Sequence, residues 1–138
     1  LAGAYFISHP KIQKAKFIVE DSNFIATNFL PKEWIRTDEL YNLKIVNPNI
    51  NVVLSIDESS YEGGTNGNFH PMAWYHEYDG GREFFTALGH DKKHYKDKNF
   101  IQHYSIIRHR FRKPKIGSSE RSVFERNLKF IKNNHTYH

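Results

Sequence analysis

The alternation of apolar and polar positions is clearest near the middle of the chain. In residues 72–77 the side chains alternate with the period of two that places successive residues on opposite faces of a strand. Asp79-Gly80-Gly81 follows, with residues that tolerate the positive φ of a tight hairpin turn. Residues 82–88 then form an aromatic, strand-favouring segment. The pattern predicts a β-hairpin with His70 at its start and His90 just past its end.

The same reasoning predicts two further strands and two loops. In residues 14–20 apolar side chains alternate with the rest of the segment, and residues 52–56 are a short apolar run typical of a buried strand. Residues 32–42 are expected to form a loop with a short turn. Residues 58–69 are rich in glycine and asparagine, so we expect a loop with little to hold it rigid. This loop is either a mobile lid over His70 or a surface loop without a role.

Helical periodicity is confined to the C-terminal part of the chain. Asp97 is placed to cap a helix whose apolar residues recur at three- and four-residue steps, namely Phe100, Tyr104, Ile107 and Phe111. Residues 113–117 read as a linker, and Ser122 with Glu125 forms a capping box for a second amphipathic helix. We therefore divide the chain into a domain portion, residues 1–112, and a basic linker with a helix, residues 113–138.

Composition narrows the possible chemistry. The chain has 138 residues, enough for one domain with a core, and a mean hydropathy of −0.70. No apolar run approaches the roughly 18 residues of a membrane span, so we expect a soluble protein without a membrane partner. Cysteine is absent, which excludes disulfides, thiolate metal ligands and a cysteine nucleophile in this sequence. The compartment stays open between cytoplasmic and secreted or periplasmic, and because the chain begins at Leu1, we expect that an upstream segment is missing.

The positive charge belongs mainly to the C-terminal part. Residues 108–138 hold nine Lys or Arg against two Asp or Glu, whereas residues 1–107 hold eleven against thirteen. A basic tail with aromatic residues raises the hypothesis of a nucleic-acid contact. The basic residues surround a helix that also has an apolar face, however, which is typical of packing with a solvated side. We therefore do not expect nucleic acid as a partner.

The hairpin also carries a family resemblance. Its pattern is His70-Pro-x-x-Trp74, a Gly81-Arg82 turn, an aromatic pair and then Leu88-Gly89-His90. The other segments with a counterpart are residues 1–10, Asp38-Glu39-Leu40-Tyr41, residues 51–57 and residues 97–111. Together these segments resemble the ThuA-like (trehalose utilisation) family, in order, over residues 1–112.

The resemblance implies a fold and an assembly. It implies an α/β fold of the class I glutamine amidotransferase-like superfamily: a partial flavodoxin-like sheet with flanking helices, here followed by a C-terminal helical tail. It also implies that this chain corresponds to the C-terminal half of such a domain. Because half a sheet exposes an edge and an apolar face, we expect a homo-oligomer or a missing N-terminal half. The alternative is a small divergent domain that closes its own sheet.

Three histidines at element boundaries are candidates for catalysis. His9 and His70 each precede a proline, which favours an extended conformation, and His90 follows Gly89. Polar residues at strand ends are where α/β proteins place their sites, and an imidazole can act as acid, base or metal ligand near neutral pH. The alternative is that these imidazoles bond backbone carbonyls at turns.

Adjacent carboxylates supply the fourth catalytic candidate. Asp38 and Glu39 lie in an otherwise apolar segment, where one of them can serve as a general acid or base, and we assign that role to Glu39. The alternative is a solvated acidic turn. The expected ligand-binding residues are Asp38, Tyr41, Trp74 and Arg82. Arg82 has a second interpretation, as a cover for the sheet edge.

The remaining histidines have simpler interpretations. We expect His76 to be a hydrogen-bonded structural residue, and His94, His103, His109, His135 and His138 to lie in polar surroundings or near the terminus. Three histidines and a carboxylate would suit a divalent metal such as zinc. No local motif with metal-ligand spacing supports that hypothesis, so no cofactor is assigned.

The sequence thus supports two hypotheses from different classes. The first is a ThuA-like domain that uses acid–base chemistry on a sugar, such as trehalose or a related glycoside, as a hydrolase or sugar-modifying enzyme. It would not be a cysteine-dependent glutaminase, because no cysteine is present. The second is a non-catalytic ligand-binding or structural module of the same fold.

Overall fold

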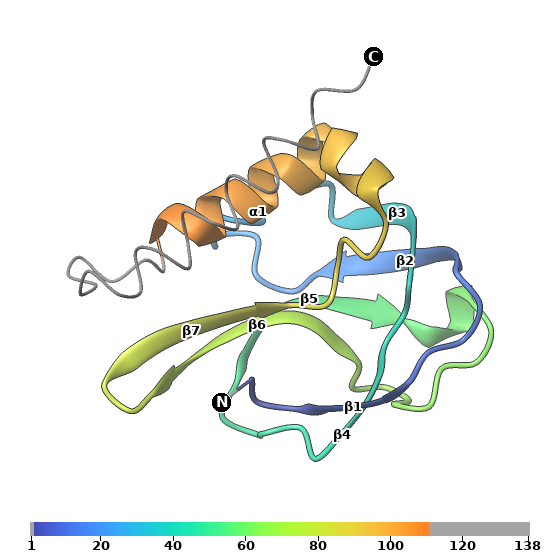
Figure 1. Cartoon of the computed structure of the whole chain (residues 1–138), viewed down its shortest axis with the longest axis horizontal. Coiled ribbons are helices and arrows are strands. Elements are labelled where there is room, and N and C mark those ends of the chain that lie inside the picture. The colour runs from blue at the N-terminus through green and yellow to red at the C-terminus, as the bar shows by residue number, and fades with distance from the viewer. Residues whose placement is uncertain (1, 111–138) are drawn as a thin grey trace.

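A computed structural model describes residues 2–110 of the chain, in which an antiparallel sheet curls beneath the helix α1 (Figure 1). The strands are β1 (Tyr5–Ser8), β2 (Gln13–Val19), β3 (Glu33–Asp38), β4 (Asn42–Lys44), β5 (Asn51–Asp57), β6 (Pro71–Tyr78) and β7 (Gly81–Thr86). The helical elements are η1 (Glu58–Ser60), η2 (Lys92–Lys96) and α1 (Lys98–Arg110). The predicted α/β class is confirmed. The second predicted helix and the boundary at residue 112 lie outside the described residues.

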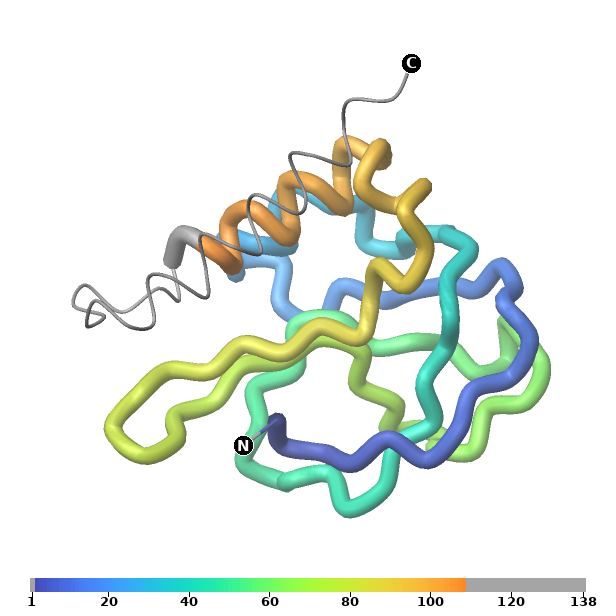
Figure 2. Tube along the Cα trace, viewed as in Figure 1, coloured from blue at the N-terminus to red at the C-terminus, as the bar shows by residue number. Residues whose placement is uncertain are grey.

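The strands form two sheets. The larger has the order β3-β2-β5-β6-β7, and β1 pairs with β4 in a separate ribbon. Every strand pair within residues 2–110 is antiparallel, so the parallel pairing typical of a flavodoxin-like sheet is not seen in this part of the chain. The trace in Figure 2 shows the β1–β4 ribbon on the side of the sheet away from α1. The curled sheet therefore has α1 on one side and this ribbon on the other.

The core forms where α1 meets the sheet. The predicted strands at residues 14–20 and 52–56 are confirmed as β2 and β5, and Phe17 and Leu54 on them are fully buried. Asp97 caps α1 as predicted, since its Oδ1 accepts hydrogen bonds from the backbone N–H groups of Asn99 and Phe100. Phe100 is itself fully buried. No helix of the described residues is long and apolar enough to cross a membrane.

The hairpin of β6 and β7 matches its prediction. Asp79 and Gly80 have φ values of 48° and 68°, and Tyr78 pairs with Gly81, which together define a two-residue type I′ turn. Trp74 stacks on Phe85 with ring centroids 4.4 Å apart. β6 is buried along most of its length rather than on one face, and Ala2 and Gly3, which precede β1, lie against its Trp74.

The prediction of a loop at residues 32–42 is wrong, because this segment contains strand β3. The side chains of Trp34, Arg36 and Asp38 alternate inward on that strand and are all buried. Two of these three are charged, so the inward face carries no apolar period that would reveal a strand. The strand forms because its charged residues have partners inside the protein.

The loop of residues 58–69 is also anchored more firmly than predicted. The side chain of Asn66 accepts from the backbone N–H of Leu43 and donates to its carbonyl, both at 2.9 Å. Asn42 bonds the backbone of Gly63 and Thr65 in the same way. Side-chain amides therefore replace the apolar contacts that the glycine-rich sequence lacks.

Candidate functional site

A single carboxylate joins two histidines that are far apart in the sequence. Oε1 of Glu39 lies 3.2 Å from Nε2 of His9, and Oε2 lies 2.9 Å from Nδ1 of His90. The Glu39 side chain is 10% exposed, whereas each imidazole is 45% exposed. The structure thus brings together three of the four residues that the sequence proposes as catalytic, with the carboxylate at the base and the imidazoles open to solvent.

Each member of this cluster comes from a different part of the fold. His9 follows β1, Glu39 follows β3 and His90 follows β7. Gly89 allows the last placement: its φ is 93°, and a Cβ there would lie 2.4 Å from the ring of Phe100. A larger residue at that position would move the backbone that carries His90.

The charges and acceptors around the two imidazoles favour particular positions for their protons. A carboxylate oxygen 2.9 Å from Nδ1 of His90 favours a proton on that nitrogen, which leaves Nε2 to face away from Glu39. Both nitrogens of His9 face acceptors, since its Nδ1 lies 3.0 Å from the carbonyl of Pro10.

Tyr41 lies beside the cluster. Burial, followed by the charge of Glu39 and a hydrogen bond to it, raises the pKa of the Tyr41 hydroxyl above its usual value. Its ring meets Phe6 edge-on, with centroids 5.1 Å apart. Tyr41 therefore remains a protonated hydrogen-bond donor next to Glu39 at neutral pH.

A buried charged cluster lies directly behind Glu39. Nη2 of Arg36 donates to Oδ2 of Asp38 at 2.9 Å and to Nδ1 of His94 at 2.9 Å. The guanidinium also lies over two aromatic rings, at 4.5 Å from Trp34 and 5.0 Å from Phe100. Burial lowers the pKa of Arg36, and Asp38 opposes that shift. Asp38, which was predicted to bind a ligand, is 0% exposed and is bonded by groups within the protein.

Sequence reasoning missed Arg36 and misplaced His94 and His103, which were expected in polar surroundings but are buried. Burial lowers the pKa of His94, and it lowers the pKa of His103 to about 4. Arg36 and Asp38 are two residues apart on one strand and so share a face. That spacing was a usable signal for an internal ion pair.

His70 belongs to a different cluster. It is 1% exposed, its Nε2 donates to the carbonyl of Tyr41 at 2.7 Å, and its Nδ1 lies 2.7 Å from Oε1 of Glu58. Because the Tyr41 carbonyl only accepts, Nε2 carries a proton, and a second proton is held between Nδ1 and Glu58. The imidazole is inaccessible to a substrate in this structure.

The two other predicted ligand-binding residues also lie away from Glu39. Trp74 is 0% exposed and donates from its indole N–H to the carbonyl of Ala2 at 2.8 Å, so its ring presents no open face to a sugar. Arg82 is exposed on the hairpin, opposite Glu77. This position favours the second interpretation, a cover for the sheet edge.

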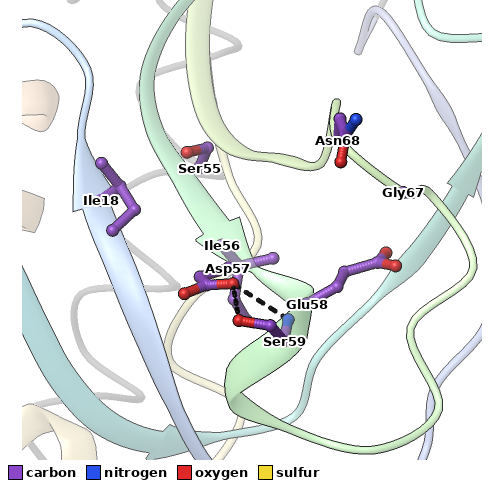
Figure 3. A pocket seen from close by; sticks show the side chains of 8 residues that line it. All are labelled: Ile18, Ser55, Ile56, Asp57, Glu58, Ser59, Gly67 and Asn68. Atoms are coloured by element: carbon purple, nitrogen blue, oxygen red, sulfur yellow. Dashed lines mark hydrogen bonds between the residues drawn. The ribbon is translucent and has the colours of Figure 1, made fainter.

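A polar hollow opens beside Glu58, away from the Glu39 cluster (Figure 3). It is lined by Ile18, Ser55, Ile56, Asp57, Glu58, Ser59, Gly67 and Asn68. The hydrogen bonds drawn there join Asp57 to Ser59 and cap η1. Among residues 2–110, no group of three His, Asp or Glu side chains has an arrangement that would hold a metal ion, so the zinc hypothesis gains no support.

Residues 1–105 match the family described as ThuA: Trehalose utilisation. Two solved structures are similar, both described as putative ThuA-like proteins. The one from Bacteroides uniformis has a TM-score of 0.60 at 19% identity, over 77% of this chain and 46% of that one. The one from Parabacteroides merdae has a TM-score of 0.53 at 20% identity, over 80% and 44%. This chain thus spans less than half of either structure, and no curated protein matches it.

Proposed function

The chain belongs to the ThuA, or trehalose utilisation, family, and from that premise we propose that it serves carbohydrate utilisation by acid–base chemistry at Glu39 and its two histidines. The observation that carries the proposal is the pairing of Glu39 with Nδ1 of the half-exposed His90 at 2.9 Å. A carboxylate on Nδ1 orients an imidazole and leaves Nε2 free to exchange a proton with a substrate.

His90 is the proposed catalytic residue. Its Nε2 takes a proton from a substrate hydroxyl, and the carboxylate of Glu39 stabilises the imidazolium that forms. The deprotonated oxygen bonds to the reacting carbon as the bond from that carbon to the leaving oxygen breaks, and the same nitrogen returns the proton to the leaving oxygen. Glu39 and His9 have a positioning role in this scheme, since both nitrogens of His9 already face acceptors.

The proposed substrate class is a disaccharide or a keto-sugar. The cluster is polar and is flanked by the hydroxyl of Tyr41 and the ring of Phe6, which suit the hydroxyls and the aliphatic face of a sugar. His70 contributes indirectly, because its bond to the Tyr41 carbonyl holds the backbone of the residue beside Glu39. Hydrolysis and other sugar modifications both fit this chemistry.

We also propose that further polypeptide covers the β1 ribbon, from a second copy of this chain or from another part of a ThuA-like protein. Tyr5, Phe6 and Ile7 on β1 are 62%, 54% and 50% exposed, and Ile45 after β4 is 74% exposed. Contiguous exposed apolar residues of this kind are typical of contact surfaces. Because Phe6 also touches Tyr41, such a partner would border the site.

The test of the catalytic proposal is turnover of trehalose, related disaccharides and their keto derivatives, followed by NMR of the products. We expect His90→Gln to lower turnover at least about 100-fold, which is the usual contribution of a general acid or base. Glu39→Gln should lower it as well. The exposed Glu62→Gln is the matched control and should not change it.

Unchanged turnover in His90→Gln would contradict the catalytic role. Absence of turnover by the unaltered chain on every sugar tested would contradict the proposed activity. Sugar binding without turnover would instead favour a non-catalytic ligand-binding module.

A further inference from the structure

The carboxylate of Asp38 is the most heavily contacted polar group behind the proposed site. Its Oδ1 accepts from the backbone N–H of Glu39 at 3.0 Å and of His90 at 3.3 Å. Its Oδ2 accepts from the backbone N–H of Gly89 at 2.9 Å and from Arg36 at 2.9 Å. Hydrogen bonds to a buried carboxylate are stronger than those between neutral groups.

These contacts join two segments that belong to different elements. Glu39 directly follows β3, whereas Gly89 and His90 belong to the segment after β7. In residues 2–110, β3 and β7 are the two outer strands of the larger sheet, so no strand pairing holds their ends in register. The backbone hydrogen bonds to Asp38 connect the residues that carry Glu39 and His90.

The groups around Asp38 restrict its orientation. Arg36 only donates, so Nδ1 of His94 must accept, and the proton of His94 is on Nε2. That nitrogen lies 3.2 Å from Oδ1 of Asp38. Arg36 therefore donates to Oδ2 of Asp38, and His94 accepts from Arg36 while its Nε2 lies beside Oδ1 without a hydrogen bond to it.

We propose that Asp38 is the positioning residue that aligns Glu39 with Nδ1 of His90, and that Arg36 and His94 hold its carboxylate for that purpose. This inference rests on the proposed function, because it specifies how the proposed acid–base pair is assembled. Asp38 itself is fully buried and does not touch a substrate.

The alternative is that Asp38 contributes only to general stability. The two roles differ in one spectroscopic property, the ring nitrogen that carries the proton of His90. Free neutral histidine favours a proton on Nε2, whereas the carboxylate of Glu39, 2.9 Å from Nδ1, favours the proton on Nδ1. A merely structural Asp38 would not change this tautomer in a folded variant.

The experiment is long-range ¹H–¹⁵N NMR of the imidazoles in the unaltered chain and in Asp38→Asn, at a pH where His90 is neutral. We expect the Nδ1–H form of His90 in the unaltered chain and a mixture dominated by Nε2–H in Asp38→Asn. Amide exchange at Gly89 and His90 should become about five- to tenfold faster, because hydrogen bonds to a charged acceptor are replaced by weaker neutral ones.

Asp57→Asn is the matched control, because Asp57 also ends a strand and accepts a backbone N–H, from Ser59, but lies outside this cluster. It should leave the His90 tautomer unchanged. If Asp38→Asn does not fold, His94→Phe tests the same support and should shift the tautomer in the same direction by a smaller amount. An unchanged His90 tautomer and unchanged amide exchange in the folded variant would overturn the proposal.

The outcome is independent of the proposed function. The tautomer requires no substrate, so it can shift as expected even if no sugar is turned over. Conversely, turnover that depends on His90 together with an unaltered tautomer in Asp38→Asn would support the acid–base site and reject the role of Asp38.

Discussion

Two glutamate–histidine pairs with similar chemistry have opposite surroundings in this protein. Glu39 binds His9 and His90, whose side chains are each 45% exposed. Glu58 binds His70, whose side chain is 0% exposed and whose other nitrogen is bonded to a backbone carbonyl. The first pair has an imidazole nitrogen open to a substrate and the second has none. Residue type and pairing alone therefore do not distinguish an accessible histidine from a buried one; the surroundings of the ring do.

The comparison also explains why His70 resembles a catalytic residue in the sequence. Both His9 and His70 precede a proline, which indicates an extended backbone at an element boundary. That signal contains no information on exposure. His9 lies at the open end of the β1 ribbon, whereas His70 lies beneath the loop of residues 58–69, whose anchoring was not predicted.

The largest expected difference between the two pairs is in how much each histidine contributes to the free energy of unfolding. His70→Ala leaves the Glu58 carboxylate and the Tyr41 carbonyl without their shared partner, and we expect it to lower the free energy of unfolding by about 3–5 kcal/mol. His90→Ala removes a half-exposed side chain and should cost at most about 1 kcal/mol. Urea unfolding of both variants measures the difference. Equal losses would remove the distinction between the buried and the exposed pair.

A third histidine extends the comparison to pH. His103 is fully buried, its Nδ1 donates to the carbonyl of Ala26, and burial lowers its pKa from about 6.5 to about 4. A lowered pKa means that the folded state favours the neutral ring. The contribution of neutral His103 to the free energy of unfolding is fully present above pH 6.5 and is lost as the pH falls toward 4. The total loss is about 3 kcal/mol.

Urea unfolding at a series of pH values between 7.5 and 4 checks this prediction. His103→Phe should flatten the dependence, because phenylalanine fills the site without a proton to gain. A variant with the same loss of stability on acidification as the unaltered chain would show that other groups cause it. Burial also lowers the pKa of His94, so we expect the stability of His103→Phe to keep part of its dependence on pH.

The parts of the fold that were predicted correctly have a regular apolar period or a specific turn. The β6–β7 hairpin and the cap of α1 are of this kind, since Asp79-Gly80 and Asp97 act locally. Strand β3 was missed because Arg36 and Asp38 point inward. Polar residues are buried only where partners exist, and those partners, such as His94, are distant in sequence.

The candidate site follows the same rule. His9, Glu39 and His90 were selected one by one, from a proline, an acidic pair and a glycine. Their meeting at one carboxylate depends on the positions of β1, β3 and β7, which local patterns do not define. Trp74 was selected for its aromatic ring, and the ring packs inside between Phe85 and the segment of Ala2 and Gly3.

Two glycines with positive φ test how rigidly each pair is held. Gly89 (φ 93°) precedes His90 and would place a Cβ 2.4 Å from Phe100, whereas Gly67 (φ 65°), in the loop near Glu58, has open space. We expect Gly89→Ala to lower stability by about 2–3 kcal/mol and Gly67→Ala by about 1 kcal/mol, since the second bears only the backbone strain. Thermal unfolding compares them. Similar losses would mean that the segment before His90 is not sterically fixed.

The smallest expected effect concerns the segment that leads into β1, the strand before His9 of the exposed pair. Trp74→Phe keeps an aromatic ring against Phe85 but removes the indole N–H that donates to the carbonyl of Ala2. One neutral hydrogen bond contributes about 1 kcal/mol, so we expect a loss of that order together with faster amide exchange in β1. Exchange around His70 should stay unchanged, because the indole N–H bonds Ala2 and the ring stacks on Phe85, neither of which bonds His70. Faster exchange around both histidine pairs would show that the β1 region and the cluster around His70 unfold as one cooperative unit. The Glu39 and Glu58 pairs would then differ in exposure and not in local stability.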